Sequence, residues 1–232
     1  MSPNKNWRSS CFLLLLLVTG ISVTGCKGRG SAVSGDGPDV MARVNDYKVT
    51  RSEVDKAYNT QVAGAPQKPN ATEEEAMRLQ VLDTIIHTRL ILEKAEKLGI
   101  KAGDDEVETK LNQAKGAYTS EQFQKRLKDL GLTEDTYKEY LRHGVLVEHV
   151  MDREIKPKLI ISDADVTAFY NQNKGQSTQT LDDQLRQKIH EKLRSQLEQL
   201  LRAAYVEGLR NSAEIHNYYA EQVLSNHKPE SK

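Results

Sequence analysis

The chain has 232 residues, and its 33 lysine and arginine residues balance 33 aspartate and glutamate residues, so its formal charge is zero. A balanced charge offers no basic surface to nucleic acid, and we expect no nucleic-acid partner. Charged residues make up 28% of the sequence and aromatic residues only 6%, which is typical of long, solvated, amphipathic helices. Both cysteines, Cys11 and Cys26, lie near the N-terminus, so we expect no disulfide in the folded part.

The first residues have the three-part layout of an export signal. Basic residues precede an unbroken apolar run, FLLLLLV at 12–18, which is shorter than the roughly 20 apolar residues of a membrane-spanning helix. The run leads to VTGC at 23–26, the pattern of a lipobox, in which small residues precede a cysteine whose thiol receives a diacylglyceryl group. We predict a lipoprotein signal peptide over 1–25 and lipidation of Cys26, with an ordinary secretory signal as the alternative.

The residue after the lipobox cysteine indicates which membrane carries the lipid anchor. Residue Lys27 is not the aspartate that often marks retention in the inner membrane. We therefore expect a periplasm-facing protein of the cell envelope, with the outer membrane favoured over the inner one. Residues 26–39 are rich in glycine and serine, which predicts a flexible tether between the lipid and the folded part.

The folded part begins with a predicted strand pair. Residues 40–50, VMARVNDYKVT, alternate apolar and polar side chains around an Asn-Asp turn, which predicts a β-hairpin. Thr50 or Ser52 is a suitable cap for the helix that follows, in which Val54 and Tyr58 recur at helical spacing.

Six further helices are predicted from apolar residues at helical spacing. The two longest cover 72–98, which opens with a capping box at Thr72–Glu75, and 181–209, where leucine and isoleucine recur every four residues. Gly99 and Pro157 are suitable stops for two of the helices. The others are predicted over 104–115, 120–130, 133–156 and 162–170.

A last short strand at Ala213–His216 is expected to pair with Val40–Val44, so that the two ends of the chain meet in one small sheet. Apolar residues four apart drift about 40° around a helix at each step. One straight neighbour cannot cover such a stripe, and several crossing helices are needed. We therefore predict a mainly α fold with a small β-strand pairing near the two chain ends.

The order of these elements resembles that of the periplasmic and surface chaperones SurA and PrsA, and of the helical part of trigger factor. The resemblance covers most of residues 40–216. Its motifs are MARVNDYKVTRSEVD (41–55), LDTIIHTRLILEKAEKLGI (82–100), DDEV (104–107), TEDTYKEYLRHGVLVEHVMDREI (133–155), ISDADVTAFYNQN (161–173) and LRAAYVE (201–207). The resemblance implies a SurA- and trigger-factor-like helical chaperone body.

The chain departs from this family at one place. The family usually carries a parvulin prolyl-isomerase domain after the helix that ends in Phe-Tyr, and here only the polar residues 171–180 follow. We predict the chaperone body without the isomerase. The expected organisation is a signal peptide over 1–25, a tether over 26–39, a SurA-like N-terminal helical module over 40–173, a linker over 174–180, a returning helix and short strand over 181–218, and a polar tail over 219–232.

The lipobox and the resemblance together imply a lipid-anchored, ATP-independent chaperone that holds unfolded or nascent exported and outer-membrane polypeptides. Apolar stripes wider than one neighbour leave part of the surface exposed, and exposed apolar surface marks a binding site. The alternative use of the same stripes is formation of the core. The residues predicted to line a client-binding groove are Val81, Ile85, Leu146, Val150, Leu193 and Leu197.

Two other functions stay open from the sequence: a prolyl isomerase with reduced activity, and an assembly lipoprotein with one fixed partner. No two of the six histidines have the spacing of metal ligands on a helix. The sequence also contains no nucleophile elbow and no phosphate-binding loop. We expect no catalytic residue, no metal site and no cofactor, and the sequence leaves the oligomeric state open.

Overall fold

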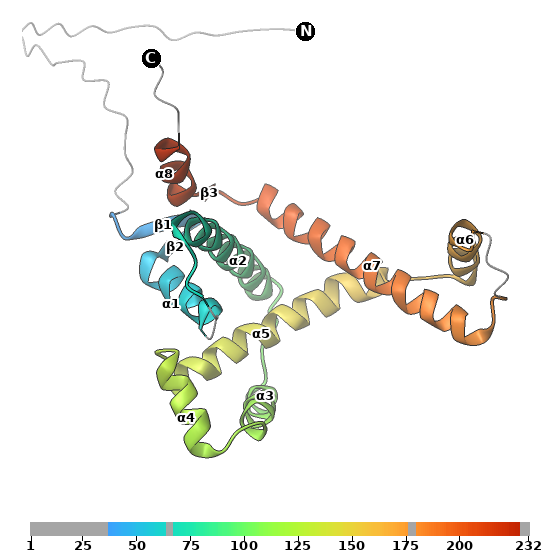
Figure 1. Cartoon of the computed structure of the whole chain (residues 1–232), viewed down its shortest axis with the longest axis horizontal. Coiled ribbons are helices and arrows are strands. Elements are labelled where there is room, and N and C mark those ends of the chain that lie inside the picture. The colour runs from blue at the N-terminus through green and yellow to red at the C-terminus, as the bar shows by residue number, and fades with distance from the viewer. Residues whose placement is uncertain (1–36, 64–66, 176–179, 228–232) are drawn as a thin grey trace, which may run out of the picture. The chain divides into compact units, whose positions relative to one another are not determined.

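The computed structural model describes residues 37–63, 67–175 and 180–227, and the predicted signal peptide and Cys26 lie outside them. The described chain is mainly helical, as predicted, with one three-stranded sheet (Figure 1). Its strands are β1 (Val40–Val44), β2 (Tyr47–Thr50) and β3 (Ile215–His216). Its helices are α1 (Arg51–Val62), α2 (Ala71–Lys97), α3 (Asp104–Gly116), α4 (Ser120–Asp129), α5 (Glu134–Ile155), the 3-10 helix η1 (Lys156–Lys158), α6 (Asp163–Asn173), α7 (Asp183–Asn211) and α8 (Tyr218–Asn226).

The small sheet joins the two ends of the described chain. The strand order is β2-β1-β3, and β1 is antiparallel to both neighbours. The β1–β2 turn places Asn45 at a φ of 51°, a left-handed conformation that asparagine tolerates better than most residues. Arg43 pairs with His216, and Val44 pairs with Ile215. The predicted pairing of a late strand with the first strand is therefore confirmed.

Helix α2 begins earlier than the sequence pattern predicted. The side chain of Asn70 accepts a hydrogen bond from the Glu73 backbone N–H at 3.0 Å, and the Glu73 carboxylate accepts one from the Asn70 N–H at 2.9 Å. The capping box predicted at Thr72–Glu75 was therefore wrong by two residues. Asparagine caps a helix at least as well as threonine, and Asn70 precedes Thr72 in the sequence, so the helix begins after Asn70. The helix ends before Gly99, whose φ of +64° suits glycine.

The sheet, α1 and α2 enclose the largest group of buried residues. We call this group cluster 1, and its members are Met41, Ala42, Val44, Val49, Val54, Tyr58, Val81, Leu82, Ile86 and Leu90. Leu209 of α7, Ile215 of β3 and Tyr219 of α8 pack against it. Residues from both ends of the chain therefore share one core.

A smaller group of buried residues joins α3 and α4 to the first half of α5. Leu111, Phe123 and Leu127 are buried there, and the Phe123 and Tyr137 rings meet edge to face at 5.8 Å. A hydrogen bond of 2.7 Å between the Lys115 ammonium and the Glu134 carboxylate lies beside this group and lowers the pKa of Glu134. Helices α3 and α4 and the first half of α5 therefore form a small lobe that is continuous in sequence and has its own apolar core.

Helix α8 lies almost entirely in the predicted polar tail, residues 219–232. The side chain of Asn217 accepts a hydrogen bond from the Ala220 N–H at 2.9 Å and so caps the helix. Tyr219 packs against cluster 1, and none of the helix's own residues is fully buried. A nine-residue helix is too short to be stable by itself, so it depends on packing against the rest of the fold, which the sequence pattern does not show.

Candidate functional site

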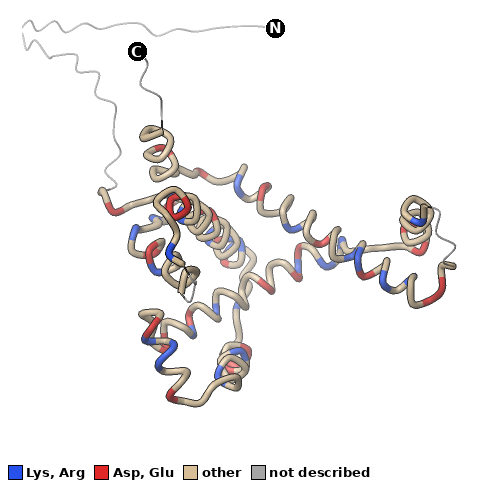
Figure 2. The backbone as a smooth tube through the Cα atoms, viewed as in Figure 1, with Lys and Arg blue, Asp and Glu red and all other residues tan. Residues whose placement is uncertain are grey.

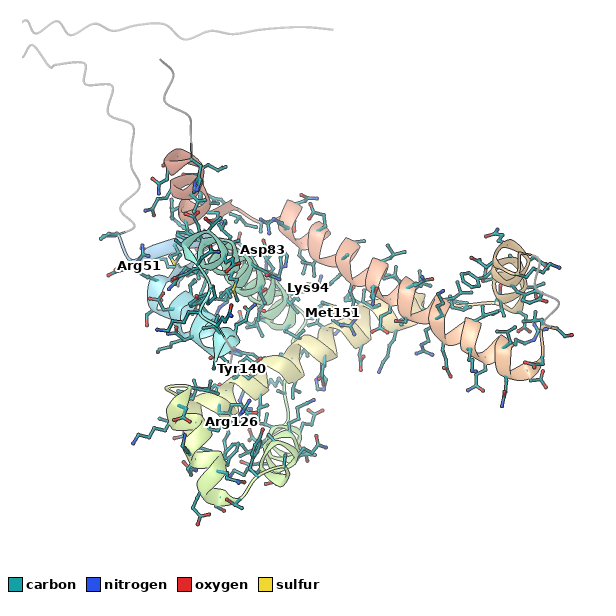
Figure 3. All side chains as sticks on the ribbon, viewed as in Figure 1. Arg51, Asp83, Lys94, Arg126, Tyr140 and Met151 are labelled. Carbon is teal, nitrogen blue, oxygen red and sulfur yellow. The ribbon has the colours of Figure 1, made fainter. Side chains whose placement is uncertain are left out.

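Helices α2, α5 and α7 meet around a second group of buried residues. Ile91 and Ala95 come from α2, whereas Val150, Met151 and Ile155 come from α5; Figure 3 labels Met151 on α5. We call this group cluster 2, and the half-buried residues that pack against it are Ile100, Leu146, Val147, Leu159, Leu201, Tyr205, Val206 and Leu209. Helix α7 contributes only half-buried side chains, so its contact with α2 and α5 excludes water less completely than the α2–α5 contact.

Polar contacts hold the C-terminal end of α7 on α2. The Arg210 guanidinium donates from Nη1 to Asp83 Oδ1 at 2.6 Å and lies 3.1 Å from His87 Nε2. Arginine is a donor only, so His87 accepts through Nε2 in this arrangement. His87 therefore helps to position α7.

The contact between α7 and α5 contains a buried polar atom without a partner. The hydroxyl of Tyr205 has no hydrogen-bond partner among the described residues. Burial, with a smaller contribution from Glu154, raises the pKa of Tyr205 to about 12. An unsatisfied buried hydroxyl costs roughly 1–3 kcal/mol. The packing of α7 against its neighbours is therefore weakened at this point.

Helix α7 leaves apolar side chains exposed between its contacts with α6 and with cluster 2. Its one fully buried residue is Ile189, in the half that packs against α6. Farther along the helix, Leu193 and Leu197 are half-buried, and Leu200 is 68% exposed. These three leucines, which we call the α7 stripe, are spaced i, i+4 and i+7 and therefore share one face of the helix.

The other four residues predicted to line a groove lie on α2 and α5. Val81 is 5% exposed inside cluster 1, and Val150 is fully buried in cluster 2. Ile85 and Leu146 are half-buried and pack against these two clusters. The structure thus places Val81 and Val150 in the interior and does not bring all six predicted residues onto one surface. The reason is that α2 packs against the sheet, α1, α5 and α7, which together cover most of its wide apolar face.

Some exposed apolar residues were not identified from the sequence. Leu200 and Leu201 are adjacent, and a helix turns by about 100° per residue, so both cannot face cluster 2. Leu201 packs against the cluster, and Leu200 does not. Ile160, 75% exposed, lies between η1 and α6, and Tyr140 on α5 is 70% exposed. The adjacent leucine pair was the signal that could have identified Leu200.

Charged residues of both signs accompany the stripe along α7 (Figure 2). An apolar stripe with charged edges has the composition of a reversible binding surface. Within 37–63, 67–175 and 180–227, no helix is long and apolar enough to cross a membrane. The same residues contain no group of three or more histidine, cysteine or acidic side chains that could hold a metal ion.

Comparison with known families decides which fold this arrangement represents. Residues 2–151, more than half of the chain, match the family model of the SurA-like N-terminal domain. The chain belongs to this family. The resemblance inferred from the order of the motifs is thereby confirmed.

Two of the curated relatives of this SurA-like chain are foldases. Foldase protein PrsA of Clostridium botulinum (strain Langeland) is 26% identical over 192 residues, a match that covers 74% of this chain and 57% of the relative. Foldase protein PrsA of Clostridium kluyveri is 27% identical over 196 residues, covering 75% and 58%. The chain therefore spans somewhat under three-fifths of the length of these relatives.

A solved structure has a similar fold. It is described as belonging to two structurally related SurA-like chaperones of Campylobacter jejuni, PEB4 and Cj1289. It matches with a TM-score of 0.51 at 12% identity, and the match covers 76% of this chain and 98% of that one. At this identity the likeness establishes the SurA-like fold alone.

The SurA-like body of this chain is continuous where the family usually inserts a parvulin domain. Phe169 and Tyr170 lie in α6, and residues 174–182 connect α6 directly to α7. The two helices pack against each other. No parvulin domain is therefore inserted between these two described helices.

Proposed function

We propose that this chain is an ATP-independent chaperone of the bacterial cell envelope, which holds unfolded or nascent exported polypeptides, including outer-membrane ones. The observation that carries the proposal is a SurA-like body whose longest described helix, α7, leaves the α7 stripe partly exposed between its two packed ends, with Leu200 68% exposed. Exposed apolar surface with charged edges is a binding site for the apolar segments of an unfolded chain.

The chemistry of the stripe suits many clients with weak affinity for each. Burying one leucine side chain completely contributes about 1.5–3 kcal/mol, and the loss of translational freedom on association offsets much of this. Leucine makes no directional bonds, so the surface selects for apolar character more than for a particular sequence. Ile85 and Leu146 are half-buried beside the two clusters, and we propose that they add client contacts to those of Leu193 and Leu197.

We propose binding without catalysis. The proposal is supported by the short connection over residues 174–182, at the place where the family usually carries its prolyl-isomerase domain. Every role proposed for the described residues consists of apolar contact and ion pairing, neither of which requires a cofactor.

The general test is suppression of aggregation. We expect the purified chain to suppress the aggregation of several unrelated, chemically unfolded proteins at near-stoichiometric ratios, as measured by light scattering without ATP. An equal concentration of a non-chaperone protein of similar size is the control. Protection of no client, together with capture of one partner in a fixed ratio, would instead support the assembly lipoprotein.

The anchor is tested separately, since Cys26 lies outside the described residues and the proposal rests on the lipobox sequence VTGC. Stable anchoring requires two lipid chains or an equivalent second signal. We expect Cys26→Ala to move the protein from the detergent phase to the aqueous phase in Triton X-114 partitioning of envelope extracts. Cys11→Ala is the matched control and should stay in the detergent phase. Unchanged partitioning of Cys26→Ala would refute the anchor, and membrane fractionation of the wild type tests the proposed outer-membrane location.

A further inference from the structure

A groove separate from the α7 stripe lies between the end of α1 and helix α4. It has a volume of about 650 Å³, within the roughly 300–1,000 Å³ that is usual for binding pockets. Thr60 and Ala63 line it from the α1 side, whereas Tyr118 and Leu130 line it from the residues at the two ends of α4. The space therefore extends along α4 and suits an extended peptide better than a compact small molecule.

The lining of the groove is partly apolar. Tyr118 presents its ring with 42% of the residue exposed, and Leu130 is half-buried. Ala63 and Ala117 contribute only methyl groups, which leave room beside the ring. An apolar side chain of a bound peptide that fills this space would remove the Tyr118 ring from water.

Two cations line the groove, and they differ in their partners. The Lys125 ammonium is paired with the Asp129 carboxylate at 2.6 Å. Arg126, labelled on α4 in Figure 3, has no ion pair with any carboxylate in the described part of the chain. Its guanidinium carbon lies over the Tyr118 ring, 5.6 Å from the centroid. Contact with the ring face restrains the guanidinium while its N–H groups stay able to bind a carboxylate through two parallel hydrogen bonds.

We infer that this groove binds an extended peptide segment in which a carboxylate side chain lies next to an aromatic or aliphatic one. The carboxylate pairs with Arg126, and the neighbouring apolar side chain packs on Tyr118. The inference rests on the proposed function, because the segment belongs to an unfolded client. It adds that a second subsite, separate from the α7 stripe, prefers clients with acidic residues beside apolar ones.

The test compares two fluorescein-labelled peptides that are identical except for Phe-Asp in one and Phe-Asn in the other. Binding to the full chain is measured by fluorescence anisotropy. We expect the Phe-Asp peptide to bind about fivefold more tightly, which is the scale of one exposed charge pair, and the preference to shrink in 0.5 M salt. Arg126→Gln should abolish the preference. Lys128→Gln, which removes an exposed charge from the same helix outside the groove lining, should retain it.

The outcomes separate this inference from the proposed function. A wild type that binds both peptides equally, or an Arg126→Gln variant that keeps the preference, overturns the groove assignment, even where aggregation suppression is intact. A preference that depends on Arg126 in a chain that suppresses no aggregation supports the groove and refutes the chaperone proposal. Circular dichroism of both variants checks that each retains the helical content of the wild type.

Discussion

Ile86→Ala is expected to lower the free energy of unfolding by about 2–5 kcal/mol, the usual cost of truncating a fully buried isoleucine. Ile86 is completely buried in cluster 1, which joins the sheet to α1 and α2. The truncation removes contacts and leaves a cavity that the surrounding strands and helices cannot fill. Because Leu209, Ile215 and Tyr219 pack on the same cluster, the last elements of the chain should lose stability with the first. Urea unfolding followed by circular dichroism measures the change.

The matched control for this substitution is Ile160→Ala, because Ile160 is 75% exposed. We expect its free energy of unfolding to stay within about 0.5 kcal/mol of the wild type. Equal losses in the two variants would contradict the assignment of cluster 1 as the core. An unfolding midpoint of Ile86→Ala equal to that of the wild type would contradict it as well.

Substitution of the α7 stripe is expected to have the largest effect on client binding. In the double variant Leu197→Gln/Leu200→Gln, two leucines of the stripe become polar residues that keep helix propensity. We expect at least about tenfold weaker client affinity, because a loss of only 1.4 kcal/mol gives that factor and two leucines can contribute more. The readout is the chaperone concentration needed for half-maximal suppression of aggregation, measured with two unrelated clients.

Leu224→Gln is the matched control for the stripe, because Leu224 is an equally exposed leucine on α8, at 72% against 68% for Leu200. It should leave client protection unchanged. The thermal midpoints of both variants should stay near that of the wild type. If Leu197→Gln proves destabilising through its half-buried position, Leu200→Gln alone still tests the stripe. Full protection by a stably folded Leu200→Gln variant, or equal losses in Leu200→Gln and Leu224→Gln, would refute the assignment of the stripe.

Several features of the fold were predictable because their causes are local. Gly99 ends α2 as predicted, and Thr50, Thr133 and Ser162 cap helices that the apolar spacing had placed after them. Helix caps and stops act through hydrogen bonds between residues a few positions apart, so their effect can be predicted from the local sequence. The error at Asn70 has the same origin, since two suitable caps stood two residues apart.

Whether an apolar stripe is buried in the core or exposed was not predictable from the sequence. Spacing shows which side chains share a face of a helix, but it does not show what covers that face. Val81 and Val150 follow the same periodic pattern as Leu193 and Leu197, yet the first two are buried and the others are half-buried on α7. The difference arises from neighbours distant in sequence: α2 packs against α1, α5, α7 and the sheet. The groove at Arg126 also depends on the end of α1, far away along the chain.

The sequence by itself determined the export signal pattern, the helical class of the fold, the presence of a late strand and the family motifs, because each depends on residue type and short-range spacing. Only the tertiary structure decided which leucines stay exposed and that the Tyr205 hydroxyl is left without a described partner. It also decided that Arg126 lines a groove without pairing with Asp129, whose carboxylate pairs with Lys125. Burial and charge pairing are properties of surfaces brought together by folding, and these surfaces come from residues separated by tens of positions in the chain.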